Sequence, residues 1–593
     1  MVLAWLPAAT SVREIATSGL APGLLSAGLG TVPPQQTYLD VSQGNRVFNS
    51  LYSSGLPALA GNCPSWWGSV LERANSAPAE IVPGLLTSTL EAAGRDVRAG
   101  GGASCVFSAH PTSDGSRTTS KKLSGTPRPD VPLPSFEVRE ASPRDLPSLV
   151  ANLHGDDLLI AIARPTGEDD DPLAIGIAGS GFDGNLTSNS TRTDGYVLAT
   201  DVAPTILEHF NVEVPSEVSG QPIRSEGSVD PAALESLQAR MEVISHRRGP
   251  VIGWSLLVWL GLLALSAAVS RGAVARTGVR LTGLAVVYMP LVMLAGAAIE
   301  PGEIAETLLI MLGAPLLAAA TLALFRGYRS LAVASAVTVL AYAIDVAAGS
   351  PLTSLSLLGP NPGLGVRFYG IGNELEALLA VLVVAGTGAA LTGFAPRLSR
   401  RRCAAAFLLV GLICALVFAA GRFGADVGAA IVFPVAAAVA AAAVAARGRG
   451  GALLVVAAPF AVLAFLALVD LVSGANAHLT RSVLDAGGLG DLADVAQRRL
   501  QLSAHSFVRP VLLAFLPVVI ALVALAIWQR RRLGKWLRRS PALRAGLIGA
   551  VAATAVGTLA NDSGALLLEI GAAYLLVFVG FVWADGARSM PYP

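Results

Sequence analysis

Charged residues are scarce in this sequence of 593 residues. They make up 14% of the chain, whereas a typical soluble protein has about 25%. Hydrophobic residues make up 53%, and this composition argues against a water-soluble multidomain enzyme. The formal net charge is only +1, so nothing in the overall charge favours nucleic acid, which is not an expected partner.

Cysteine and lysine are also rare. Four cysteines in so long a chain exclude a scaffold built from disulfides. Only three of the 42 basic residues are lysines, which, with the abundance of alanine, glycine and valine, indicates a high-GC bacterial gene. Cys403 and Cys414 fall in an apolar run and are expected to act as small apolar residues. Cys63 and Cys105 are able to form a bridge in an oxidising compartment, but the sequence does not show whether they meet.

The hydrophobic residues are concentrated after residue 250. Eleven apolar runs there approach the roughly 20 residues that a helix needs to cross the hydrocarbon core of a membrane. They lie at about 251–270, 281–299, 305–325, 330–348, 372–393, 403–420, 426–446, 451–473, 510–528, 543–560 and 565–584. Buried helices of a soluble core keep a polar stripe, so the sequence instead predicts an all-α polytopic domain of about 11 transmembrane helices in the lipid bilayer of the cell membrane.

Basic residues mark alternate connections between these runs. The connections after the first, third, fifth, seventh and ninth runs contain Arg271, Arg276, Arg280, Arg326, Arg329, Arg397, Arg400, Arg401, Arg402, Arg447, Arg449, Arg530, Arg531, Arg532, Lys535, Arg538 and Arg539. The positive-inside rule places these connections in the cytoplasm. Residues 1–250 then lie outside the membrane and the C-terminus lies in the cytoplasm. Arg247 and Arg248, just before the first run, weakly favour the opposite orientation.

The start of the chain bears on this orientation. Export needs a signal, yet the sequence opens MVLAWLPAATSVREIA, which has no basic segment and only a short apolar stretch. Either the true start lies upstream, so that this sequence is truncated, or the orientation of the first helix is wrong; we favour truncation. The expected domains are an extracytoplasmic domain at 1–229, a linker helix at 230–250, the transmembrane domain at 251–585 and a cytoplasmic tail at 586–593.

The extracytoplasmic domain is predicted to have an α/β fold. Residues 156–162 and 173–179 are typical of two buried strands separated by an acidic turn. Asp201 precedes an apolar helix with Pro204 in its first turn, which is a good start signal for a helix. Residues 100–145 have no periodicity and are expected to form a mobile loop.

Three segments of this domain resemble the alkaline phosphatase/sulfatase superfamily. Asp201, Pro204 and Thr205 match the D-x-x-P-T-[IL]-L helix of that superfamily, and residues 220–223 match its closing segment. Residues 19–48 look like the segment after the first strand, where the superfamily has its nucleophile. The resemblance implies an incomplete alkaline phosphatase-like domain, fused to an actinobacterial-type polytopic membrane region.

The metal ligands of the superfamily are not matched. Its working members hold two metal ions with Asp and His side chains and use Ser or Thr as the nucleophile. Where a Ser-Asp-His-Gly ligand turn should follow strand 156–162, this chain has the residues 163–167, Ala-Arg-Pro-Thr-Gly. His110, His154 and His209 are not in ligand spacing either. The domain is therefore predicted to be a pseudoenzyme without a metal, which still binds a phosphate- or sugar-bearing ligand.

Polar side chains gather where three of the predicted helices begin. We call 365–376, 421–426 and 561–564 the three starting segments; each combines glycine with an acid or an arginine, and all lie on the predicted outer side. Their candidate site residues are Arg367, Tyr369, Asn373, Glu374, Arg422, Asp426, Asn561 and Asp562. Because an ionisable side chain inside a membrane segment costs a few kcal/mol, we expect these residues to form a polar pocket that opens outward.

The residue types suggest what this pocket binds. Arg367 and Arg422 are suited to hold a phosphate or pyrophosphate through bidentate contacts. Glu374, Asp426 or Asp562 is then a base, a cation ligand or a sugar contact. No cofactor is predicted, although a divalent cation is possible at the outer face. The alternative is that the starting segments are ordinary loop ends, where charges are common and glycines cap helices.

A long outer loop, 474–509, contains His478 and Arg481. A histidine and arginines on a large outer loop also occur in polytopic glycan polymerases and O-antigen ligases, which use undecaprenyl-pyrophosphate-linked sugars. This is a similarity of layout without a matching signature. The alternative is an amphipathic helix that lies on the membrane surface.

Three classes of function stay open. We favour an integral membrane protein of the bacterial cell envelope whose non-catalytic outer domain binds or positions a lipid-linked or phosphate-bearing glycan precursor. The second is a transporter or flippase of an envelope component, although the helix middles have almost no charge, whereas transport sites usually lie near the midplane. The third is a membrane sensor or scaffold without catalysis, whose partners are other envelope proteins.

Overall fold

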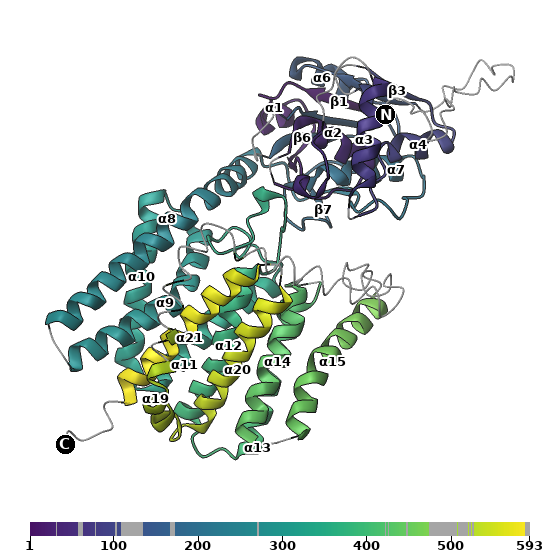
Figure 1. Ribbon diagram of the computed structural model, residues 1–593. Coiled ribbons are helices and arrows are strands. Elements are labelled where there is room, and N and C mark those ends of the chain that lie inside the picture. Colours follow the sequence, from purple (N-terminus) through teal and green to yellow (C-terminus); the bar gives the residue numbers. More distant parts are fainter. Residues whose placement is uncertain are drawn as a thin grey trace, which may run out of the picture. The chain divides into compact units, whose positions relative to one another are not determined.

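The computed structural model describes residues 1–30, 32–56, 63–77, 79–100, 104–107, 135–165, 172–269, 272–421, 423–424, 426–445, 449–473, 507, 517, 520, 523–524, 527–561 and 563–586. The chain folds into two compact units (Figure 1). The first is Met1–Val243 together with Asn361–Phe368, and the second is Ile244–Pro360 together with Tyr369–Pro593. The short segment Asn361–Phe368, which we call the inserted segment, therefore belongs to the first unit although both of its sequence neighbours belong to the second.

The first unit is built on a seven-stranded mixed sheet (Figure 1). Its strands, in their order across the sheet, are β3 (Val97–Ala99), β4 (Phe136–Glu140), β1 (Val2–Leu6), β5 (Leu159–Ala163), β6 (Leu173–Ala178), β2 (Ala21–Ser26) and β8 (Tyr196–Leu198). Strand β6 is antiparallel to both of its neighbours, and the other pairings in the sheet are parallel. Strands β7 (Asn185–Ser188) and β9 (Ile223–Glu226) form a separate antiparallel pair. This unit has the α/β architecture that the sequence predicts.

Helices connect and cover the strands of the first unit. They are α1 (Val12–Thr17), α2 (Pro34–Gln43), α3 (Cys63–Asn75), α4 (Leu85–Ala92), α5 (Ser104–Phe107), α6 (Leu146–Ala151) and α7 (Val202–His209). Strand β5 is apolar and all five of its residues are buried, as expected of a strand that is covered on both faces. Trp5 of β1 packs edge-to-face on Tyr38 of α2, with ring centroids 4.5 Å apart, so aromatic packing joins the sheet to a helix.

Local patterns predict part of this unit correctly. The two predicted strands and the helix after Asp201 are confirmed as β5, β6 and α7, and Pro204 is buried in the first turn of α7. The prediction of a mobile loop over 100–145 is wrong at its end, because β4 pairs there with β3 and β1. Phe136 and Val138 alternate into the core with no exposed surface, a pattern too short to stand out in a Pro- and Ser-rich stretch. The opening residues, which the sequence analysis assigns to no element, form β1, an interior strand between β4 and β5.

The three cysteines whose side chains the structure describes fall into two kinds. Cys105 is disulfide-bonded. The side chain of Cys63, with which the sequence allows a bridge, lies outside the described residues. Cys403 and Cys414 are buried and free, in line with their expected role as small apolar residues in membrane helices.

The second unit is helical (Figure 1). Its elements are α8 (Pro231–Val269), which begins in the first unit, α9 (Ala273–Ile299), α10 (Glu303–Leu324), α11 (Tyr328–Ala347), α12 (Asn373–Phe394), α13 (Arg400–Ala419), α14 (Val427–Ala445), α15 (Arg449–Ser473), α19 (Arg530–Leu537), α20 (Pro541–Ala560) and α21 (Gly564–Gly586). The predicted linker helix and the first apolar run form one continuous helix, α8.

Nine helices in the described part of the chain are long and apolar enough to cross a membrane. They correspond to nine of the eleven predicted runs, and the chain is a multi-pass membrane protein. Of the other two runs, 451–473 lies in α15. The run at 510–528 lies almost entirely outside the described residues.

Glycines allow α12 to pack closely against α20. A Cβ atom at Gly388 would lie 2.8 Å from the carbonyl oxygen of Ala542, and one at Gly546 would lie 2.7 Å from that of Val384. A Cβ atom at Gly549 would similarly meet the backbone of α14. Small residues at helix interfaces let backbones approach closely in membranes. Helix α12 also contacts α11 and α21. The glycines therefore set the position of a helix, α12, that several other helices of the described bundle pack against.

Two arginines in α8 pair with glutamates in the first turns of other helices. Nη1 of Arg247 lies 3.0 Å from Oε2 of Glu306 in α10, a side chain with no exposed surface. Nη1 of Arg248 lies 3.4 Å from Oε1 of Glu374 in α12. A buried carboxylate depends on such a partner because an uncompensated charge is costly to keep away from water.

We predict that Arg247→Ala lowers the free energy of unfolding by about 3–5 kcal/mol, because it removes a cationic partner from the fully buried Glu306 carboxylate. Thermal and denaturant unfolding of the purified chain in detergent measures this loss. Arg247→Ala combined with Glu306→Gln should recover part of it. The matched control is Arg13→Ala, which breaks the exposed pair with Glu235 and should leave the unfolding temperature unchanged. Equal losses in the two single variants would contradict the prediction.

Candidate functional site

The starting segments of α12 and α14 touch through their backbones. The amide of Ile371 donates a hydrogen bond to the carbonyl oxygen of Gly424 at 3.2 Å. A Cβ atom at Gly370, whose φ is +79°, would collide with the same carbonyl group. Glycine at position 370 therefore permits a contact that a side chain would block.

A buried carboxylate lies where three helices converge. The side chain of Glu376 in α12 has no exposed surface, and its Oε2 accepts a hydrogen bond from Nδ2 of Asn561 at 2.8 Å. A Cβ atom at Gly428, in the first turn of α14, would lie 2.5 Å from the same Oε2. Asn561 directly follows α20, so α12, α14 and the connection from α20 to α21 all approach one carboxylate.

Asp426 adds a second buried acid beside this contact. It is 3% exposed, and its Oδ1 accepts a hydrogen bond from the amide of Gly428 at 3.1 Å. We define Glu376, Asp426, Gly428 and Asn561 as the polar junction. It contains residues from all three starting segments or directly beside them. Buried acids in a membrane domain mark candidate functional sites because they are costly to keep there.

The other predicted site residues are placed differently. Glu374 pairs with Arg248, while Tyr369 and Asn373 are half-buried in the second unit. Arg367 is half-buried in the inserted segment. Four of the predicted residues lie outside the described part of the chain: Arg422, Asp562, His478 and Arg481.

Sequence reasoning did not select Glu376 or Gly428 as site residues. Each lies two positions after a residue that it did select, Glu374 and Asp426. The signal that was present is the second acid in the first turn of α12. Contacts with helices distant in the sequence decide that Glu376, and not Glu374, is buried in the bundle. A local sequence pattern does not contain that information.

The inserted segment is held in the first unit by backbone hydrogen bonds. The amide of Gly30 donates to the carbonyl oxygen of Leu364 at 2.9 Å. The hydroxyl of Tyr196 in β8 donates to the carbonyl oxygen of Pro362 at 3.1 Å. These two contacts hold the segment at Pro362 and at Leu364.

Arg46 completes this attachment. Its Nη2 donates to the carbonyl oxygen of Gly365 at 2.8 Å and its Nη1 donates to that of Gly28 at 3.2 Å. The guanidinium also lies 5.7 Å from the ring centroid of Phe368. A guanidinium has several donors and no acceptor, so one arginine can join the inserted segment to the loop after β2. Burial lowers the pKa of Arg46, and the charge of Asp40 opposes that shift.

The place of this attachment bears on the resemblance to phosphatases. Ligands of α/β sheets bind outside the carboxyl ends of the strands. Ser26 ends β2, and the side chain of Tyr196 comes from the neighbouring strand β8. At the carboxyl end of β2, the edge of the sheet is covered by a piece of the chain itself, because Gly365 lies against Ser26 and Gly28.

Asp201 and Thr205 join helix α7 to residues 221–223, two of the segments on which the predicted resemblance to phosphatases rests. The carboxylate of Asp201 is fully buried and accepts hydrogen bonds from the hydroxyls of Ser188 and Ser190 and from two backbone amides. Oγ1 of Thr205 accepts from the amide of Ile223 at 2.8 Å. Both carboxylate oxygens of Asp201 are therefore committed to donors of the protein, which is the environment of a structural residue and not of a metal ligand.

Metal-binding geometry is lacking in the described ranges. There, no group of three or more His, Cys, Asp or Glu side chains is placed to hold a metal ion. After β5, where the superfamily has its ligand turn, Arg164 pairs with Glu140 at 3.3 Å. A divalent cation at the outer face stays a prediction, since Asp562 lies outside the described residues.

Comparison of the chain with models of protein families, with curated proteins and with solved structures finds no match. The two matching segments, which contact each other in the structure, remain the basis of the resemblance to phosphatases. The fold class established here is a mixed α/β unit joined to a bundle of apolar helices.

We predict that Gly365→Ala detaches the inserted segment. Gly365 has φ +68°, and a Cβ atom there would collide with the carbonyl oxygen of Gly28 and lie 2.7 Å from Oγ of Ser26. Hydrogen exchange of the amides in 361–368 should become faster. The control is Gly30→Ala, which has φ +66° but open space around the added methyl group, so it suffers only the backbone strain of about 1–2 kcal/mol. Equal exchange in both variants would argue against a steric role for Gly365.

A second prediction concerns Asp40 in α2. Complete burial raises the pKa of Asp40 to about 7, although hydrogen bonds from Gln36 and Gln43 favour the ionised form. In the unfolded chain this carboxyl titrates near pH 4. Its contribution to stability is therefore fully present below about pH 4 and is lost as the pH rises through about 7.

Asp40→Asn removes this titration. Between pH 4 and pH 8 the unfolding temperature of the wild type should therefore fall relative to that of the variant. Asp96→Asn, at an exposed position paired with Arg98, is the control and should follow the wild-type profile. Parallel pH profiles for wild type and Asp40→Asn would show that the acid is not protonated in the folded state.

Proposed function

We propose that this chain is an integral membrane protein of the bacterial cell envelope that handles a lipid-linked or phosphate-bearing glycan precursor at the outer face of the membrane. Its α/β unit is a non-catalytic outer domain. The polar junction carries this proposal, because three helices bring Glu376, Asp426 and Asn561 together at one end of an apolar bundle. Membrane helices keep buried acids where a polar ligand or an ion needs them.

The distribution of charge within the bundle supports an outward-facing site. Helices α12, α14 and α21 begin at the polar junction, whereas α13 begins with Arg400, Arg401 and Arg402. Helix α13 runs back from the end of α12, so its arginines lie at the opposite end of the bundle. Arginine-rich ends favour the cytoplasm, and the polar junction is then at the outer face.

The outer domain has a positioning role in this proposal, because it holds the inserted segment and needs no catalytic activity to do so. The inserted segment contains Arg367 and leads directly into α12, which carries Glu376. By holding this segment through Arg46 and Tyr196, the outer domain restricts the position of an arginine suited to bind phosphate. A domain that resembles phosphatases but lacks their metal ligands would in this way hold a phosphate-binding residue in place.

One observation favours a transporter or flippase as the second candidate. Glu569 lies in the second turn of α21 and is 9% exposed. Its Oε1 has no hydrogen-bond partner among the residues that the structure describes. An acid inside a membrane helix is a typical element of a transport pathway. The two candidates differ in the leaflet in which a blocked precursor would collect.

We predict that Glu376→Gln and Gly428→Ala cause a severalfold accumulation of polyprenyl-linked glycan precursor in cells that depend on this protein. The first variant removes the negative charge of the polar junction, and the second pushes the Glu376 carboxylate away from Asn561. Mass spectrometry of membrane lipid extracts measures the precursor, and a membrane-impermeant reagent reports its leaflet. The proposal predicts accumulation in the outer leaflet, whereas a flippase predicts accumulation in the inner leaflet.

The matched control is Glu303→Gln. Glu303 is also an acid in the first turn of a membrane helix, but it is exposed and lies outside the polar junction. Its substitution should leave precursor levels at the wild-type value. Unchanged precursor levels in both junction variants, with normal amounts of folded protein in the membrane, would rule out the proposed function.

A further inference from the structure

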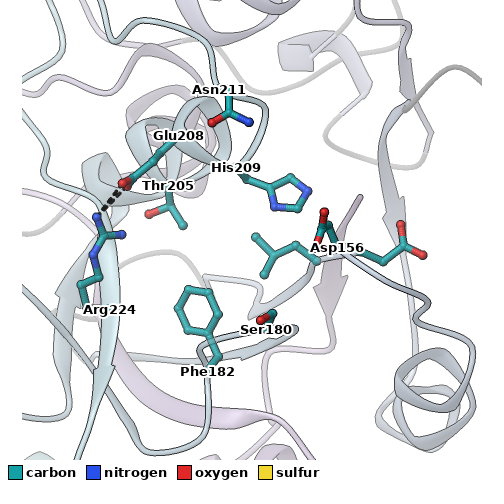
Figure 2. A pocket seen from close by; sticks show the side chains of 10 residues that line it. Asp156, Ser180, Phe182, Thr205, Glu208, His209, Asn211 and Arg224 are labelled. Carbon is teal, nitrogen blue, oxygen red and sulfur yellow. Dashed lines mark hydrogen bonds and ion pairs between the residues drawn. The ribbon is translucent and has the colours of Figure 1, made fainter.

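A cavity of about 320 Å³ lies in the first unit (Figure 2). Asp156, Asp157 and Leu158 precede strand β5, while Ser180 and Phe182 follow strand β6. The rest of the lining comes from α7, the residues after it and β9, namely Thr205, Glu208, His209, Asn211 and Arg224. Since β5 begins and β6 ends here, the cavity lies at the edge of the sheet opposite to the one that holds the inserted segment.

Half of the eight polar side chains around this cavity are available to a ligand. Figure 2 shows the imidazole of His209 and the carboxylate of Asp156 on one side of the cavity, with Phe182 below. Among the residues that the structure describes, the side chains of Asp156, Ser180, His209 and Asn211 have no hydrogen-bond partner. These unpaired donors and acceptors can bond to hydroxyl groups of a ligand, and the ring of Phe182 can pack against its C–H groups. The cavity therefore suits a ligand that has hydroxyl groups on one side and C–H groups on the other.

The charge of the lining is negative. It contains three carboxylates and one guanidinium, and that guanidinium is already paired, since Nη2 of Arg224 lies 2.7 and 2.8 Å from the two oxygens of Glu208. Asp156 and Asp157 therefore carry charge that no cation in the lining compensates. Burial lowers the pKa of His209, which keeps the ring neutral near pH 7. Such a site attracts a cation and repels a phosphate.

We propose that this cavity binds a sugar that carries a free amine, a hexosamine, with its ammonium group at Asp156 and Asp157 and its ring against Phe182. Hydroxyl groups of the sugar bond to His209, Ser180 and Asn211. This site does not depend on the polar junction, which is in the other unit, so either proposal can fail while the other stands. If both hold, the outer domain binds a sugar of an envelope glycan at a place separate from the phosphate.

Three matched sugars test the proposal: glucosamine, glucose and glucose 6-phosphate. Their binding to the full chain in detergent is measured by isothermal calorimetry and by saturation-transfer NMR. Glucosamine should bind at least about tenfold more tightly than glucose, because its ammonium group makes charge-assisted hydrogen bonds. Glucose 6-phosphate should bind more weakly than glucose.

Variants of the lining residues test whether the sugar binds in this cavity. Asp156→Asn should lower glucosamine affinity about tenfold and leave glucose affinity nearly unchanged, while Phe182→Ala should weaken both sugars alike. Asp156 is exposed and without a partner in the described structure, so this variant should fold, and its unfolding temperature verifies that. The control is Asp183→Asn, an exposed acid next to Phe182 that does not line the cavity. No sugar binding, equal binding of glucose 6-phosphate, or equal effects of Asp156→Asn and Asp183→Asn would overturn the proposal.

Discussion

The close approach of α12 to α20 is the constraint on which the membrane unit depends. Gly388 and Gly546 let the two backbones come together, and small residues supply this kind of packing in membranes, where no hydrophobic force drives helices together. The two helices run antiparallel, so the contact between the second half of α12 and the first turns of α20 also brings the start of α12 to the end of α20. Glu376 and Asn561 meet there, and the polar junction is thus a result of glycine packing farther along both helices.

Sequence patterns could predict the elements but not their partners. The apolar runs, β5, β6 and α7 are each visible within a window of about 20 residues, because burial imposes a local period. The contact of Arg46 with Gly365 joins positions 319 residues apart, and that of Glu376 with Asn561 joins positions 185 apart. No local period records such a pairing. Strand β4 was missed for a different reason, since its two core residues are surrounded by loop-like sequence.

Arg247 and Arg248 have a structural role that the charge pattern does not reveal. By their position just before the first apolar run, these residues favour a cytoplasmic start of α8. In the structure each is paired with a glutamate from another helix, Glu306 and Glu374. The packing of the helices therefore gives a reason for two arginines at this position, and the orientation of the chain stays a prediction from the arginine-rich connections.

The inserted segment also has a consequence for how the protein is made. The first unit is completed by residues that follow α8, α9, α10 and α11 in the chain. At about 5–20 residues per second, a ribosome needs on the order of ten seconds to add the intervening stretch. During that time Arg46 and Tyr196 lack their partners in 361–368. The first unit can reach its final form only after those four helices have been synthesised, so its folding is completed only after most of the first four membrane helices have left the ribosome.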